Sequence, residues 1–471
     1  MAKIVMLGAG PSGLAASLLL ARDGHEVTVL ERDADPVPES GAQAWEQWSR
    51  DGVTQFRQAH LLAAGGCAVL REALPDVYEA LLSAGARRFD PLASMPPTLA
   101  DFQARPDDER FATFTARRPV IEQALARPAQ SEPGMQVRRG VAVQELTLAT
   151  AADGAAHVTG VRTDGGETLS ADLVVDAMGR RSQLPRWLGS AGVGQIPEES
   201  EDSGFIYYTR YFRSTDGSTP PQYGPPLAPI GTFSILTLPA DNDTWSVTTY
   251  VSAGDQALKR MRDADAWTAV VRACPAQAHW LEGEPISDVM AMGGVVDRHR
   301  SLCAQGRPLL TGIALLGDAW ACTNPSLGRG VTLGLLHARC LSDTVKAHLD
   351  DDPAEFALAW DAITEQKLMP WYRETVAEDR ERLREIEALR QGVEPGPPSE
   401  HSAALRAALQ TAMLHDADLF RAFLESRTCL TPLGEILARD GVAEQIQALA
   451  DEHEPLVIPG PSREQLLALL A

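Results

Sequence analysis

Three glycines near the N-terminus have a spacing that is chemically informative. Gly8, Gly10 and Gly13 form a G-x-G-x-x-G pattern between an apolar run and a helical pattern over residues 14–22. Glycines at this spacing allow a tight turn and a close approach to a pyrophosphate, whose charge a helix N-terminus stabilises. Glu31 ends the next apolar run, and its carboxylate can accept hydrogen bonds from a ribose diol. The pattern predicts a dinucleotide site; a plain βα turn with a chance acidic residue is the alternative.

A second cue lies some 300 residues downstream. Gly317-Asp318-Ala319 closes a buried apolar run, and Asn324-Pro325-Ser326-Leu327-Gly328-Arg329-Gly330 precedes a helical pattern that starts at about Val331. The N-terminus of this helix can stabilise negative charge. We expect it to face the same bound molecule as the first glycine turn.

Together these segments resemble the flavin-dependent monooxygenase superfamily, which includes the group A aromatic hydroxylases, squalene epoxidase and bacterial FAD epoxidases of polyether biosynthesis. The resemblance implies that Asp318 hydrogen-bonds the ribityl chain of FAD. It also implies that Pro325, Gly328 and Gly330 lie against the isoalloxazine ring, where a helix N-terminus favours a reduced, negatively charged flavin.

Other segments extend the resemblance over roughly residues 3–345. The stretch 52–60 is similar to the family's GVPQxRHxH segment, with Gln58 where a histidine is usual, and Asp172-Leu173-Val174-Val175-Asp176-Ala177-Met178-Gly179-Arg180-Arg181-Ser182 is similar to its DLVVDATGRxS strand. The resemblance therefore adds these residues to the cofactor site: Arg32, Gln55, Arg57, Arg118 and Asp176.

The elements that must position these residues are distributed along the whole chain. Runs at residues 3–7, 26–30, 173–176 and 313–316 are apolar on both faces, which is typical of a parallel sheet covered by helices. Between them, residues 201–289 are rich in aromatic and β-branched residues and predict an antiparallel sheet. We therefore expect an α/β fold in which a Rossmann-type FAD-binding domain of the glutathione-reductase-like kind is interleaved with a substrate sheet.

The predicted domain bounds follow from this division. The FAD-binding domain takes residues 1–90, 110–200 and 290–345, the substrate domain takes 91–109 and 201–289, and a helical region takes 346–471.

Alternation along one strand of the substrate sheet places Tyr207, Thr209 and Tyr211 on one face. We assign these three residues and Phe233 to the substrate pocket, although an aromatic strand is more often plain core.

Composition excludes several classes of protein. The chain of 471 residues has a formal net charge of −22, which disfavours nucleic acid as a partner. Its 6 cysteines are scattered singly, so neither a disulfide framework nor a metal site is indicated. No apolar run approaches the roughly 20 residues that cross a bilayer, and no signal peptide is evident at the N-terminus. A cytoplasmic location is therefore expected.

The resemblance implies a monooxygenase that inserts one oxygen atom from O2, through a flavin C4a-hydroperoxide, into a hydrophobic small molecule of specialised metabolism. Epoxidation and hydroxylation both stay open, and no side chain stands out as a base. The absence of a second G-x-G-x-x-G means that NADPH or NADH binds transiently or that a separate flavin reductase delivers the electrons.

Three alternatives remain. The first is an FAD-dependent reductase or dehydrogenase of the geranylgeranyl reductase type, which shares the fold. The second is a flavin halogenase, although no WxWxIP motif is present. The third is a non-catalytic binding protein similar to the GDP-dissociation inhibitors of small GTPases.

Overall fold

The computed structural model describes residues 1–99, 102–150, 156–398 and 400–471. A parallel five-stranded sheet, in the order β22-β10-β1-β2-β6, forms the nucleotide-binding unit. Its strands are β1 (Lys3–Leu7), β2 (Glu26–Glu31), β6 (Met135–Arg139), β10 (Leu173–Asp176) and β22 (Ile313–Leu315). The predicted Rossmann-type sheet is thus confirmed, and segments far apart in sequence build it.

Helices cover one face of this sheet, and strands β7 (Val143–Thr150) and β8 (Ala156–Thr163) together with helix α6 (Leu184–Ser190) cover the other. Both faces are therefore buried, which explains why the strands are apolar on both sides. Helix α1 (Pro11–Arg22) is buried along most of its length and packs against α8 (Gly330–His348) and α5 (Arg118–Ser131). The remaining helices of this part are α2 (Gly41–Gln47), α3 (Ala64–Ala73), α4 (Pro75–Ser83), α6 (Leu184–Ser190) and α9 (Pro353–Lys367).

In the described parts of the chain, four small sheets flank the nucleotide-binding unit. Their strands are β3 (Ala59–Leu62), β4 (Arg87–Phe89) and β5 (Thr113–Arg117); β7 (Val143–Thr150), β8 (Ala156–Thr163), β9 (Thr168–Ser170) and β21 (Leu310–Thr311); β11 (Glu198–Asp202), β18 (Val296–Arg300) and β23 (Ala321–Cys322); and β19 (Cys303–Ala304) with β20 (Arg307–Pro308).

The predicted antiparallel sheet is also present, in the order β13-β14-β15-β12-β16 with β17 beside β12. Its strands are β12 (Phe205–Arg213), β13 (Leu227–Ile230), β14 (Phe233–Pro239), β15 (Thr244–Ser252), β16 (Glu284–Pro285) and β17 (Met290–Met292). Helices α7 (Ala264–Arg272) and α15 (Arg463–Leu469) cover one face through a cluster that includes Trp267 and Leu466. The opposite face is turned toward the nucleotide-binding unit.

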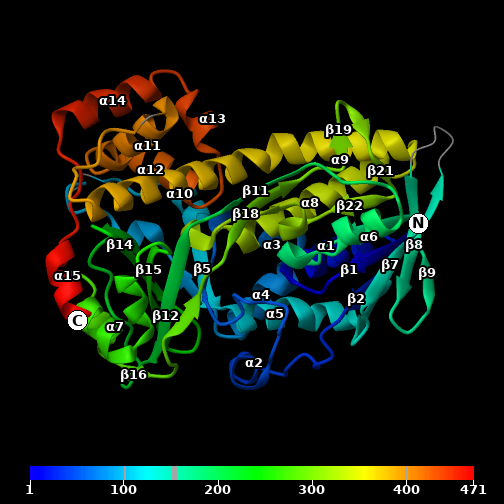
Figure 1. Cartoon of the computed structure of the whole chain (residues 1–471), viewed down its shortest axis with the longest axis horizontal. Helices are drawn as coiled ribbons and strands as arrows, with labels where there is room; N and C mark the ends of the chain where they lie inside the picture. The colour runs from blue at the N-terminus through cyan, green and yellow to red at the C-terminus, as the bar shows by residue number, and fades with distance from the viewer. Residues whose placement is uncertain (100–101, 151–155, 399) are drawn as a thin grey trace.

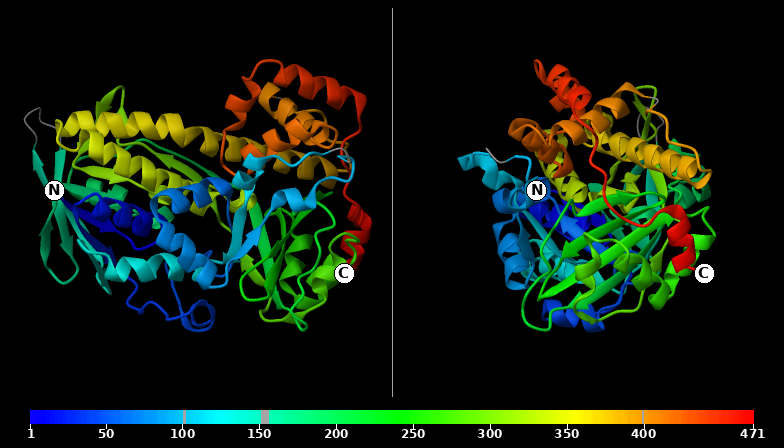
Figure 2. Two further views of the ribbon diagram at one scale, coloured as in Figure 1. Left: turned by 180° about the vertical axis from the view of Figure 1, so that it is seen from behind. Right: turned by 90° about the vertical axis from the view of Figure 1, so that its left-hand side faces the viewer.

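Helix α10 (Met369–Arg390) joins the two parts. In Figures 1 and 2 it continues from α9, above the parallel sheet, to a position above the antiparallel sheet. There Ile386 packs against Phe205, Tyr207 and Tyr250. The helical C-terminal region predicted from sequence therefore lies over the substrate sheet rather than apart from it.

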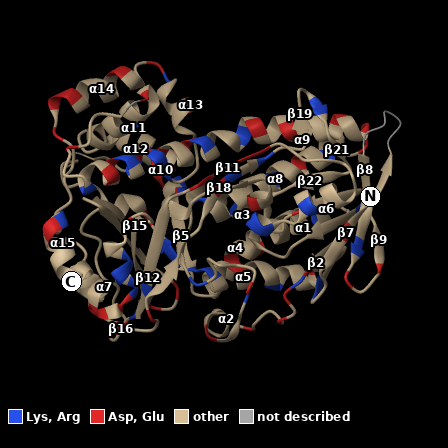
Figure 3. Cartoon of the chain, viewed as in Figure 1, with Lys and Arg blue, Asp and Glu red and all other residues tan. Residues whose placement is uncertain are grey.

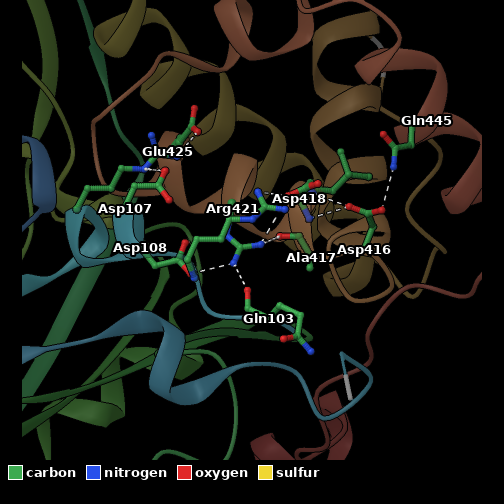
Figure 4. Close-up of polar contacts among 12 residues, drawn as sticks. Gln103, Asp107, Asp108, Asp416, Ala417, Asp418, Arg421, Glu425 and Gln445 are labelled. Atoms are coloured by element: carbon green, nitrogen blue, oxygen red, sulfur yellow. Dashed lines mark hydrogen bonds and ion pairs between the residues drawn. The ribbon is translucent and has the colours of Figure 1, made fainter. Parts of the chain in front are cut away.

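The last helices form a small cluster at one end of the molecule. They are α11 (His401–Ala412), α12 (Ala417–Arg427), α13 (Leu433–Leu437) and α14 (Val442–Glu452). Figure 4 shows Arg421 of α12 donating to both carboxylate oxygens of Asp108, at 2.7 and 2.8 Å, and to the carbonyl of Gln103. Described residues of the 91–109 segment, which we assigned to the substrate domain, therefore contact the C-terminal helices.

Acidic and basic side chains are mixed on the surface. Figure 3 shows both signs along α10, and ion pairs such as Arg380 with Glu201 contribute to this pattern. Among the residues that the structure describes, no helix has the length and apolar character needed to cross a membrane.

Candidate active site

One cavity extends from the glycine turn after β1 to the face of the antiparallel sheet that carries Tyr207. Most of the predicted site residues line it: Gly8, Gly10, Glu31, Arg32, Gln55, Arg118, Tyr207, Thr209, Asp318, Pro325, Gly328 and Gly330. The fold thus brings together segments that are up to about 300 residues apart in the chain.

The three glycines of the first motif have different roles. A Cβ on Gly8, whose φ is +104°, would lie 2.7 Å from the carbonyl of Ala177, and one on Gly13 would lie 2.2 Å from the carbonyl of Gly8. A Cβ on Gly10 would meet no atom within 4 Å. Gly8 and Gly13 therefore permit close backbone packing, which explains why Gly13 is absent from the cavity wall. Gly10 keeps the space before the N-terminus of α1 open for a phosphate.

Glu31 occupies the predicted position at the end of β2, and it is fixed there by a residue that sequence reasoning missed. Its Oε2 accepts a hydrogen bond from the amide of Ala9 at 2.9 Å and forms an ion pair with Arg50. Its Oε1 accepts a hydrogen bond from the amide of Asp33. A carboxylate has about four acceptor sites. One acceptor site at Glu31 is therefore left for a ligand hydroxyl.

Arg50 is only 6% exposed and also pairs with Glu122 and Asp33. Burial opposes its charge, but the carboxylates of Glu122 and Glu31 outweigh that effect and raise its pKa. No periodic pattern or motif marks Arg50 in the sequence, since it lies in an irregular loop.

Glu122 connects this network to the far end of the cavity. Its Oε1 accepts from Nε of Arg118 at 2.6 Å, and Nη1 of Arg118 lies 3.0 Å from Nε2 of His60. Burial and the adjacent Arg118 lower the pKa of His60 to about 3. His60 is therefore neutral, donates from Nδ1 to the carbonyl of Gln58, and accepts from Arg118. It orients Arg118 and cannot serve as a base near neutral pH.

The segment from Gly317 to Gly330 closes the cavity around Asp318. Burial raises the pKa of this carboxyl although Arg118, Arg180 and Arg298 oppose the shift. In the described parts of the chain its carboxylate accepts no hydrogen bond, so it is available to a ligand hydroxyl.

Gly328, with φ of +66°, and Gly330, the first residue of α8, present backbone to the same space. A Cβ on Gly330 would meet no atom within 4 Å. Together with the open side of Gly10, these features fit an extended FAD.

Two residues assigned to the cofactor point elsewhere. Arg57 donates to the carbonyls of Trp45 and Trp48, which ties down the loop after α2. Asp176 is fully buried beneath the cavity floor, where it accepts from the hydroxyl of Ser182 and, at 3.0 Å, from the amide of Met178. Both predictions are corrected: these side chains shape the loops that line the cavity rather than the cavity itself.

The substrate sheet contributes cross-strand pairs to the cavity. Tyr207 is opposite Tyr250 and Thr209 is opposite Thr248, and all four side chains line it. Met292 and Leu236 supply apolar surface beside them. This end of the cavity combines an apolar wall with several hydroxyl groups.

The other two pocket assignments are corrected. Tyr211 shares the face of Tyr207, but the ring of Trp45 lies edge-on against it with centroids 4.9 Å apart, beyond the end of the cavity. Phe233 belongs to the opposite face, in the cluster with Tyr208 and Trp267. Its partner across the strands is Val251, so the alternation of β14 turns Phe233 away and turns Leu236 inward.

Comparisons with known proteins agree with this geometry. The family model described as FAD binding domain matches residues 1–358. Among curated proteins, the chain is 26% identical to Protein Rv3254 of Mycobacterium tuberculosis over 359 residues, 73% of each chain. It is 25% identical to a menaquinone reductase of Mycolicibacterium smegmatis over 386 residues, 78% of this chain and 80% of that protein.

Among solved structures, pqsL, described as a probable FAD-dependent monooxygenase from Pseudomonas aeruginosa, aligns with a TM-score of 0.60 and 18% identity. The alignment covers 82% of this chain and 96% of that one, and it shows a shared fold. Since the family model spans most of the chain, including both loops that line the cavity, the protein belongs to the FAD binding domain family.

Proposed function

We propose that this protein is an FAD-dependent monooxygenase that inserts one oxygen atom from O2 into a hydrophobic small molecule, by epoxidation or hydroxylation. The observation that carries the proposal is the continuity of the cavity. It joins the dinucleotide turn at Gly10 directly to the apolar and hydroxyl-bearing face of β12 and β15. The likeness in fold to a probable FAD-dependent monooxygenase supports it.

The chain's own residues hold and orient the cofactor. Gly10 and the N-terminus of α1 receive the pyrophosphate, Glu31 accepts from the ribose, and Asp318 accepts from the ribityl chain. The turn from Pro325 to Gly330 stabilises negative charge on the ring. When bound, FAD supplies the redox chemistry that activates O2. The buried sheet end excludes water from the reacting groups.

Electrons come from NADPH or NADH, either directly or through a separate flavin reductase. The described structure contains one glycine turn of the dinucleotide type, after β1, and bound FAD would occupy it. In the direct case, the nicotinamide donor therefore binds transiently.

A reductase is the second candidate, because a menaquinone reductase is 25% identical over 386 residues. The same cavity would then take a quinone or polyprenyl chain, and FAD would pass reducing equivalents to it without inserting oxygen.

An anaerobic visible spectrum of the purified protein, recorded before and after NADPH or NADH and again after air is admitted, tests both proposals. Flavin bands that bleach and return with oxygen uptake coupled to product support the monooxygenase. Bands that bleach and are reoxidised by a quinone without oxygen uptake support the reductase. A colourless protein that cannot be reconstituted with FAD contradicts both.

A further inference from the structure

A chain of hydrogen bonds leads from the substrate end of the cavity into α10. The hydroxyl of Tyr207, which lines the cavity, bonds Oδ1 of Asn324 at 2.8 Å. Nδ2 of Asn324 donates to Oδ2 of Asp379 at 3.0 Å. Asp379 is 5% exposed and lies beyond residue 358, where the family match ends. The C-terminal helical region thus reaches the wall of the cavity through one carboxylate.

The direction of each bond follows from the charge of Asp379. An ionised carboxylate can only accept hydrogen bonds. The amide of Asn324 must therefore turn its NH2 toward Asp379 and its carbonyl oxygen toward Tyr207. A carbonyl oxygen can only accept, so the proton of Tyr207 is committed to Asn324. The phenolic oxygen then offers the cavity lone pairs and no donor.

The backbone of Asn324 is held as firmly as its side chain. Its amide nitrogen donates to Oδ1 of Asp297 on β18 at 2.6 Å. Asn324 is 2% exposed, so it has no water with which to exchange partners. Two buried carboxylates thus fix this residue from two sides.

We propose that Asp379 is a positioning residue that, through Asn324, makes Tyr207 a hydrogen-bond acceptor toward the cavity. The preferred ligand is then an apolar molecule with a hydroxyl or N–H group where it meets Tyr207. This inference rests on the proposed function in taking the sheet end of the cavity as the substrate pocket.

The arrangement depends on pH. Burial raises the pKa of Asp379 to about 7, and the charges of Asp297 and Glu378 act in the same direction. Tyr207 and Tyr250 face it from the sheet and are uncharged at this pH, since burial raises the pKa of both. Once protonated, Asp379 can donate to Asn324, the amide can turn over, and Tyr207 is free to donate. The selectivity for donor ligands is therefore present above about pH 7 and is lost below it.

The test uses the FAD-loaded protein without reductant and two probes, 2-naphthol and 2-methoxynaphthalene, titrated calorimetrically at about pH 8 and about pH 6. At the higher pH we expect 2-naphthol to bind about five- to tenfold more tightly, as one additional hydrogen bond provides. Tyr207→Phe and Asp379→Asn should both reduce this ratio to less than about twofold. The wild-type ratio should fall similarly at the lower pH.

Tyr208→Phe is the matched control, because Tyr208 lies on the same strand with its ring on the opposite face. It should leave the ratio unchanged. Equal affinities for the two probes in the wild type, or no binding of either, would overturn the ligand class. A ratio that survives Asp379→Asn would overturn the positioning role.

A second measurement needs no ligand. The tyrosine doublet in ultraviolet resonance Raman spectra distinguishes donor from acceptor phenols, and the difference between wild type and Tyr207→Phe isolates one ring. This difference spectrum should show Tyr207 as a hydrogen-bond donor at the higher pH, and the signal should change in Asp379→Asn. A signal typical of an acceptor at the higher pH would overturn the proposal. Neither experiment requires turnover, so a failure of the monooxygenase proposal, seen in oxygen uptake, is distinguishable.

Discussion

The two ends of the cavity are built in different ways. At the dinucleotide end, the turn from Gly8 to Gly13 and the carboxylate of Glu31 belong to one β-α-β unit. At the sheet end, Tyr207, Asn324 and Asp379 come from three elements that are 117 and 55 positions apart in sequence. The first end depends on local spacing, whereas the second depends on how distant elements pack.

Because of this difference, the two ends should respond differently to substitution.

Arg50→Met should have the largest effect, on the dinucleotide end. Glu31 would be left buried without its cation and Glu122 would keep only its pair with Arg118, and breaking a buried ion pair in this way typically costs about 3–5 kcal/mol. Chemical denaturation measures the loss. Arg22→Met is the control, because the ion pairs of Arg22 with Asp76 and Glu132 are partly solvated and should matter by less than about 1 kcal/mol. Equal losses in the two variants would contradict the buried network.

Gly13→Ala and Gly10→Ala should separate packing from binding within one turn. A methyl group at Gly13 meets the carbonyl of Gly8, so we expect a loss of about 1–3 kcal/mol in unfolding free energy together with weaker FAD binding. A methyl group at Gly10 projects into open space, so the loss should stay below about 1 kcal/mol while FAD binding still weakens. Denaturation and fluorescence titration with FAD measure the two effects. Unchanged FAD affinity in Gly10→Ala would show that no phosphate lies there.

Two buried groups of the site, His60 and Asp379, should also differ in the sign of their effect on the pH dependence of stability. Burial lowers the pKa of His60 from 6.5 to about 3, so the unfolded state takes up a proton first and stability falls as the pH drops below 6.5. Burial raises the pKa of Asp379 from 3.8 to about 7, so the stability cost of its charge disappears as the pH falls from about 7 toward 4.

The unfolding free energies of His60→Gln and Asp379→Asn, each compared with wild type across this range, should therefore change with opposite slopes. The limiting slope is about 1.4 kcal/mol per pH unit. Slopes of the same sign would show that one of these two groups is not buried in the protonation state that we infer for it.

Asp318→Asn should have the smallest effect, a loss of about fivefold in FAD affinity, because one acceptor toward a hydroxyl is weakened. Asp176→Asn is its control, since the carboxylate of Asp176 bonds Ser182 and Met178 and does not line the cavity. FAD titration should show a change in the first variant and little in the second. The reverse result would restore Asp176 to the cofactor site.

The sequence predicted the parallel sheet, the antiparallel sheet and most of the residues that line the cavity, because glycine turns and apolar runs are local signals. It failed where a neighbour decides the outcome. Tyr211 and Tyr207 are equivalent by alternation, and only Trp45 removes Tyr211 from the cavity. Arg57 has the expected position, but the carbonyls of Trp45 and Trp48 capture its guanidinium. The polar contacts of Arg50, Asn324 and Asp379 follow no recognised sequence pattern, so these residues were not predicted.

By itself, then, the sequence determined the fold and the dinucleotide end of the site, since G-x-G-x-x-G and its flanking strand and helix act within about 30 residues. What the cavity presents to a second molecule depends instead on how distant elements pack. The polarity of Tyr207 depends on a carboxylate in α10, and burial, which no local pattern encodes, sets both the charge of that carboxylate and the direction of every hydrogen bond that follows from it.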